Sequence, residues 1–119
     1  MTRTFVEMPQ FTKEWKDLGL DDEDLRALQN IIMSDPEVGA LIRGTGGLRK
    51  MRFAYVGRGK SGSTRVIYLD YVLSETVFLF SAYEKSRKEN LSQEERNELK
   101  KLVTLVKKAE REARKNDNV

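Results

Sequence analysis

Seven basic residues lie between Val38 and Leu69, in a stretch that contains no aspartate or glutamate. The rest of the chain holds 15 bases and all 19 acids, so positive charge is concentrated at its centre. Arginine offers phosphate oxygens a planar fork of donors, and lysine offers a point charge. Unpaired like charges repel, so this density indicates a polyanion site, with nucleic acid as the natural ligand. The seven bases are Arg43, Arg49, Lys50, Arg52, Arg58, Lys60 and Arg65.

The chain contains neither histidine nor cysteine, which excludes most of the common catalytic and metal-binding arrangements. Without histidine it lacks the usual general base and any Ser-His or Cys-His pair. Without cysteine it lacks disulfides and zinc ribbons. We therefore expect no metal and no cofactor, and catalysis would depend on lysine, arginine, tyrosine, hydroxyl or carboxylate groups.

Three predicted strands, over residues 48–55, 63–72 and 76–83, position the bases. In the first strand Lys50 and Arg52 alternate with apolar residues, so both side chains lie on one face of the sheet. Residues 63–72 are β-branched and aromatic, and residues 76–83 are nearly all apolar. The link over 56–63, which has three glycines, predicts a flexible hairpin loop that carries two more bases. These two are Arg58 and Lys60.

Helical patterns flank the strands. A short strand over 2–8 precedes two helices, over 9–19 and 21–35, and a capping box at Ser92 and Glu95 starts the last helix. The order β-α-α-β-β-β-α predicts an α+β fold with a small antiparallel sheet and helices on one face. We expect one domain over residues 1–119, cytoplasmic and without membrane contact, in which residues 110–119 form an exposed tail.

Four tyrosines and two glycine-rich segments lie near the bases. Four tyrosines lie in or beside the strands, where most would belong to the core with the hydroxyl at the rim. Tyr83, at a strand end, is the one that we single out for RNA contact or catalysis. The glycine-rich segments 44–47 and 57–62 do not predict a P-loop, because neither opens a helix.

Three segments, taken in order and spacing, resemble a known family. They are "GTGGLRKMRFA", "GRGKSGSTRVIYL" and "LFSAYEKSRKENLSQEE". Together they are similar to the RelE/HigB-type toxins of bacterial toxin–antitoxin modules, and most similar to the HigB branch. The likeness runs from about Gly44 to Glu95, and the N-terminal elements agree in order.

The resemblance implies a RelE-like toxin fold and a ribosome-dependent mRNA endoribonuclease that cleaves without metal. It also implies a cognate antitoxin, usually of the helix-turn-helix type, through which alone the toxin would meet operator DNA. The residues that would surround the scissile phosphate are Lys50, Arg52, Arg65 and Lys85, with Tyr83 as a further catalytic candidate. Those expected to contact the ribosome or the RNA backbone are Arg43, Arg49, Arg58 and Lys60.

The general base is the least determined of these roles. The tyrosine that RelE carries on its C-terminal segment has no counterpart here, since that position falls near Leu91. Tyr83 or a lysine would then act as the base. We favour Lys50, because a lysine crowded by arginines loses its proton more readily. Arg65 would stabilise the phosphorane oxygens, and Lys85 would lie near the leaving oxygen.

Two other functions remain open at this point. One is a non-catalytic RNA- or ribosome-binding module that uses the same basic sheet face. The other is a protein-interaction domain whose basic patch docks an acidic segment. Steep salt dependence would separate RNA binding from a tight apolar interface, and cleavage of mRNA on translating ribosomes would separate the endoribonuclease from both.

Overall fold

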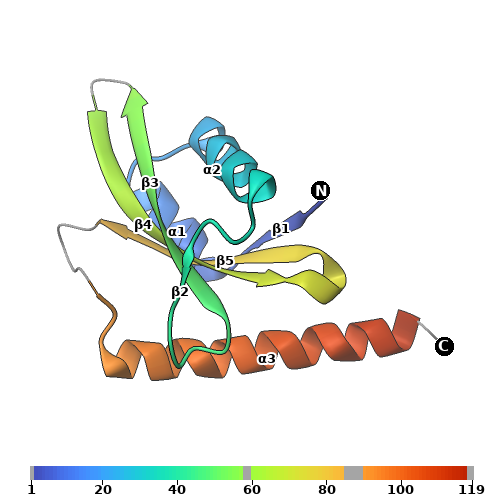
Figure 1. The fold of residues 1–119 in the computed structure, drawn as a ribbon. Helices are drawn as coiled ribbons and strands as arrows, with labels where there is room; N and C mark the ends of the chain where they lie inside the picture. The colour runs from blue at the N-terminus through green and yellow to red at the C-terminus, as the bar shows by residue number, and fades with distance from the viewer. Residues whose placement is uncertain (1, 58–59, 85–89, 118–119) are drawn as a thin grey trace.

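The computed structural model describes residues 2–57, 60–84 and 90–117, excepting the side chains of 56–57, 60–61 and 116–117. In these residues a five-stranded sheet and three α-helices make up the fold, which confirms the predicted α+β class (Figure 1). The elements are β1 (Thr4–Glu7), α1 (Pro9–Asp17), α2 (Asp22–Ser34), β2 (Ala40–Leu41), β3 (Leu48–Gly57), β4 (Lys60–Tyr71), the 3-10 turn η1 (Val72–Ser74), β5 (Thr76–Glu84) and α3 (Gln93–Asp117).

The strands lie in the order β1-β5-β4-β3-β2. Neighbours are antiparallel except β1 and β5, which pair in parallel from Thr4 opposite Thr76 to Glu7 opposite Leu79. The predicted antiparallel sheet is therefore confirmed except for this parallel pair, and the two-residue strand β2 was not predicted. A tight turn determines the direction of consecutive strands, but no turn joins β1 to β5, so local sequence does not encode their direction.

Helices cover both faces of the sheet, whereas the sequence predicted helices on one face only. Helices α1 and α2 pack against residues such as Phe53, Tyr68 and Leu79. Helix α3, orange to red in Figure 1, packs on the other face against residues such as Ile67 and Phe80. Residues 76–83 of β5 are all buried. The continuous apolar run in this strand is therefore explained by burial on both sides.

The hairpin between β3 and β4 is longer than the sequence predicted. The predicted loop covered 56–63, but β3 continues to Gly57 and β4 begins at Lys60, with these two residues paired. Tyr55 lies opposite Gly62, where an added Cβ would stand 3.0 Å from the tyrosine hydroxyl oxygen. The glycine thus leaves room for the ring instead of marking a loop.

The predicted helix starts are confirmed. Asp21 and Asp24 form a capping box at α2, and Ser92 and Glu95 exchange backbone–side-chain hydrogen bonds of 3.0 and 3.1 Å at α3. Helix α3 continues to Asp117, so the predicted exposed tail is helical over most of its length. Its residues 111–115 are exposed, although the Arg114 guanidinium donates a hydrogen bond to the Leu73 carbonyl.

Candidate functional site

One row of paired residues carries most of the predicted catalytic groups. Arg52 on β3 lies opposite Arg65 on β4, and Arg65 lies opposite Tyr83 on β5. Paired residues share a sheet face, as do residues two apart on one strand, so Lys50 lies on the same face. Arg52 is exposed, and Lys50 and Arg65 are half-buried. We call Lys50, Arg52 and Arg65 the basic face.

The basic face lies on the side of the sheet that α3 covers. On β4, Arg65 is followed at alternate positions by Ile67 and Leu69, both of which belong to the apolar cluster with α3. Lys50 Nζ lies 3.5 Å from Oδ1 of Asn90, just before α3. The start of α3 therefore borders the basic face, and the remainder of the helix covers the apolar part of the same surface.

Among the described residues, the charges of the basic face have no acidic ion-pair partner. In the described part of the chain Lys50, Arg52 and Arg65 form no ion pair. Within that part, the buried Nε of Arg65 also has no hydrogen-bond acceptor. A buried donor without an acceptor costs about 1–3 kcal/mol. Such a donor beside other unpaired cations suits an anionic ligand.

Arg3 shows how a partly buried arginine is paired elsewhere in this fold. Its Nε donates to Asp70 Oδ1 at 2.8 Å, and the two side chains are only 8% and 9% exposed. This hydrogen bond raises the pKa of the Arg3 guanidinium. Among the described residues Arg65 has no such acceptor for its Nε. The unsatisfied donor is therefore a feature of the surroundings of Arg65 and not of every buried arginine in this fold.

Tyr83 belongs mainly to the core. It is 7% exposed and lies in the apolar cluster that contains Leu99 and Val103 of α3. Its backbone carbonyl accepts a 2.9 Å hydrogen bond from the Thr64 hydroxyl. A direct catalytic role for Tyr83 stays a prediction, and its burial makes a lysine the better candidate for the base.

The predicted RNA-binding residues are not all on the basic face. Arg49 lies on the opposite face of β3, where it donates a 2.8 Å hydrogen bond to the Gly39 carbonyl and lies 3.9 Å from Glu37 Oε2. Arg43 is exposed on the connection between β2 and β3. Arg58 and Lys85 lie outside the described residues, as does the side chain of Lys60.

Tyr68 supports β3 and β2 from the face opposite the basic residues. Its fully buried hydroxyl accepts a 2.9 Å hydrogen bond from Gly39 N–H and donates one of 2.8 Å to the Pro36 carbonyl. Burial raises the pKa of the Tyr68 hydroxyl. Because Ala40 pairs with Lys50, the segment that Tyr68 holds lies directly beside a residue of the basic face.

The glycine-rich segment 44–47 anchors α3. The buried Thr45 hydroxyl donates to the Ile42 carbonyl at 2.7 Å and accepts from Leu48 N–H at 3.2 Å. Lys107 of α3 donates a 2.5 Å hydrogen bond to the Gly46 carbonyl. The segment thus contacts the helix structurally, which agrees with the prediction that it is not a P-loop.

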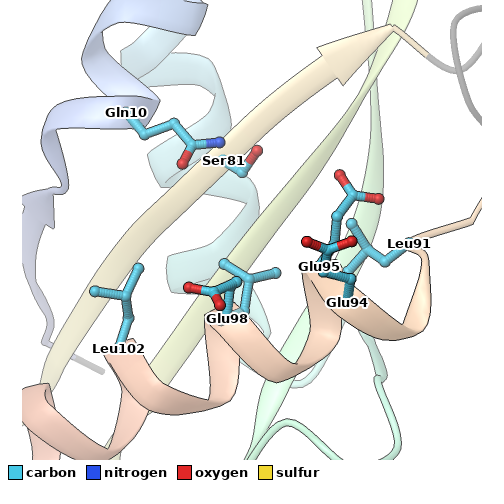
Figure 2. Close-up of a pocket in the computed structure, with 8 residues that line it drawn as sticks. Gln10, Ser81, Leu91, Glu94, Glu95, Glu98 and Leu102 are labelled. Carbon is cyan, nitrogen blue, oxygen red and sulfur yellow. The ribbon is translucent and has the colours of Figure 1, made fainter.

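A separate cavity of about 270 Å³ lies between α1, β5 and the first half of α3. Figure 2 shows the side chains of α3 that rise toward Gln10 and Ser81 from the helix below. The carboxylates that line the cavity belong to Glu94, Glu95 and Glu98. These acids would repel RNA phosphates, so we do not assign this cavity to RNA.

Neither a metal-binding cluster nor a membrane-spanning helix occurs in the part of the chain that the structure describes. In residues 2–57, 60–84 and 90–117, no group of three or more His, Cys, Asp or Glu side chains could hold a metal ion. In the same ranges no helix is long and apolar enough to cross a membrane.

Comparisons with known proteins agree with this fold. The sequence model of the family described as "RelE toxin of RelE / RelB toxin-antitoxin system" matches residues 2–116. A mutant of the E. coli toxin RelE in the free state has 20% identity and a TM-score of 0.53, over 75% of this chain and 90% of that one. In the intact E. coli RelBE toxin–antitoxin complex, a chain with 20% identity has a TM-score of 0.51, over 70% and 96%.

Proposed function

Because this chain belongs to the RelE family of toxins from RelE/RelB toxin–antitoxin systems, we propose that it is a ribosome-dependent mRNA endoribonuclease. It cleaves by attack of an RNA 2′-OH on the adjacent phosphate, without metal. The motifs "GTGGLRKMRFA" and "GRGKSGSTRVIYL" favour the HigB branch within this wider group. A non-catalytic RNA-binding module is the alternative that the experiment below must separate.

The observation that carries the proposal is the basic face. Three cations occupy adjacent positions on two paired strands, and in the described part of the chain none of them forms an ion pair. Electrostatic repulsion among Lys50, Arg52 and Arg65 is a cost in the free protein. The negative charge of a bound phosphodiester attracts all three cations and offsets their repulsion. This attraction is strongest in the transition state, where further negative charge develops on the phosphate.

The chemistry requires one base and stabilisation of negative charge. Lys50, in its neutral form, takes the proton from the 2′-OH, and the 2′-oxygen then forms a bond to phosphorus. Arg52 and Arg65 stabilise the non-bridging phosphorane oxygens. The bond from phosphorus to the 5′-oxygen breaks, and that oxygen receives a proton from Lys85. The products are a 2′,3′-cyclic phosphate and a 5′-hydroxyl.

The proposed partners follow from the family and the charge. The family takes its name from a toxin–antitoxin system in which RelE is the toxin. We propose that the antitoxin of this chain is of the helix-turn-helix type and that it alone contacts operator DNA. Ribosome and mRNA are the proposed targets in the cytoplasm. Arg43, Arg58 and Lys60 remain candidates for ribosome contacts, and Arg49 is a weaker candidate because Gly39 and Glu37 engage it.

The test is inducible expression in bacteria, followed by 5′-end mapping of cellular mRNA. Wild type should arrest growth and produce new mRNA 5′ ends, and Arg65→Ala should lose both effects while its melting temperature is retained. Arg26→Ala is a matched control, because Arg26 is exposed on α2 at the opposite face of the sheet. Growth arrest without new 5′ ends would favour the non-catalytic module, and an Arg65→Ala variant as toxic as wild type would remove Arg65 from the site.

A further inference from the structure

Helix α3 contributes a cation that the sequence pattern did not single out. Arg96 lies among glutamates in "QEERNE", where it looks like one member of a solvated charged surface. In the structure it precedes Leu99 by three residues and Val103 by seven, and both of these pack on the sheet. Residues at this spacing share one helix face. Arg96 is accordingly half-buried.

The contacts of the first turns of α3 locate Arg96 relative to the strands. Leu91 and Leu99 line one cavity with Ser81 of β5, and Ser81 pairs with Ile67 in the row that also contains Lys50. Two residues further along each strand, the next row on the same face holds Arg52, Arg65 and Tyr83. Arg96 thus lies on the same side of the sheet as the basic face, at the end of α3 that borders it.

Arg96 and Arg65 share an unusual hydrogen-bonding state. Each has a buried Nε, and in the part of the chain that the structure describes neither nitrogen has an acceptor. Glutamates flank Arg96 on its own helix, yet among the described residues it forms no ion pair with them. Buried donors that a fold leaves unsatisfied are unusual, and a bound acceptor is one explanation.

We propose that Arg96 is a further RNA-contacting residue of this site and that it binds a backbone phosphate next to the one held by Arg65. The proposal rests on the proposed function, because it assumes that RNA occupies the basic face. The Arg96 guanidinium would contact the RNA backbone from α3, and the basic face would contact it from the strands. The phosphate would supply the acceptor that the buried Nε lacks in the free protein.

The test uses ribosomes programmed with an mRNA whose 2′-oxygens are methylated, so that it can be bound but not cleaved. Affinity is measured over a range of salt concentrations for wild type and for the variants Arg96→Met, Arg96→Lys, Arg65→Ala and Arg26→Met. Methionine keeps the apolar stem of Arg96 and removes the charge. We expect Arg96→Met to weaken binding about tenfold, as for loss of one charge-assisted hydrogen bond. The salt dependence should fall by about 0.7 in log–log slope, as for one phosphate contact on a single strand.

The controls separate a contact from a structural role. Arg96→Lys should recover part of the affinity, and the melting temperature of Arg96→Met should equal or exceed that of wild type, because no acceptor is lost. If Arg96→Met binds like Arg26→Met while Arg65→Ala is weakened, the inference about Arg96 is wrong and the proposed function stands. If Arg65→Ala binds like wild type, Arg65 does not hold the bound RNA and the inference about Arg96 fails with it. If wild type itself does not bind, the proposed function fails.

Discussion

Replacement of Tyr68 by phenylalanine removes one hydroxyl that serves two buried backbone groups. The hydroxyl accepts from Gly39 N–H at 2.9 Å and donates to the Pro36 carbonyl at 2.8 Å. Each hydrogen bond contributes about 0.5–1.5 kcal/mol, and a buried group that loses its partner costs about 1–3 kcal/mol. We expect Tyr68→Phe to lower the free energy of unfolding by about 2–3 kcal/mol, which for a chain of this size is a fall of roughly 8–12 °C in melting temperature.

Urea denaturation at neutral pH measures this loss, and the m-value should stay the same because the exposed surface of the unfolded chain does not change. Tyr71→Phe is the matched control. Tyr71 is also buried, at 7% exposure, but in the described part of the chain its hydroxyl makes no hydrogen bond. A loss for Tyr68→Phe no larger than that for Tyr71→Phe would refute the role given to the two hydrogen bonds.

The raised pKa of Tyr68 adds a pH dependence to the same experiment. Burial raises this pKa above 10, the ordinary value, so the folded state holds the proton more tightly than the unfolded state does. The contribution is complete below pH 10 and is lost as pH rises through the folded-state pKa. Wild type should therefore lose stability above pH 10 more steeply than Tyr68→Phe, and parallel curves would contradict the assignment.

Three further predictions concern the base, the glycine beside it and the end of α3. Lys50→Arg should lower mRNA cleavage at least about 10²-fold in an assay with purified ribosomes while ribosome binding is kept, since arginine does not release its proton; a loss under about threefold would assign the base elsewhere. Gly39→Ala should lower the free energy of unfolding in urea by roughly 1–3 kcal/mol, because the new Cβ would stand 2.9 Å from the Lys50 carbonyl oxygen. Deletion of residues 110–119 should change it by less than about 1 kcal/mol, since residues 111–115 are exposed and the hydrogen bond that Arg114 donates is exposed as well; a larger fall in the melting midpoint would show that this end of α3 is packed.

Alternation along residues 48–55 was enough to predict that Lys50 and Arg52 lie on one face of the sheet. A strand has a period of two, so Lys50 and Arg52 had to share a face whatever lay around them. The pairing of Arg52 with Arg65 was not readable in the same way, because the register depends on the turn at the end of the hairpin. The three glycines between residues 56 and 63 predict a loop, but β3 continues to Gly57 and β4 begins at Lys60.

Features that depend on contacts between distant segments could not be predicted from the sequence. The direction of β1 and the placement of α3 on the second face depend on contacts between segments far apart in the chain, which no local pattern reports. Ile31 and Leu102 each lie three residues after a buried leucine, a spacing that favours burial on the same helix face, yet they are 40% and 39% exposed. Arg96 was hidden for the opposite reason, since charged neighbours on both sides made it look like a surface residue.

The alternation of β3 has a practical consequence for producing this protein. Residues that pack against α1 and α2, such as Met51 and Phe53, point to one side of the strand, and Lys50 and Arg52 point to the other. Substitutions at the latter two positions leave the packed layer between β3 and the N-terminal helices unchanged. If these two residues act in cleavage as proposed, their substitution should give a natively folded toxin of low activity that can be expressed in quantity. Such a form retains its other surfaces for isolating the cognate antitoxin.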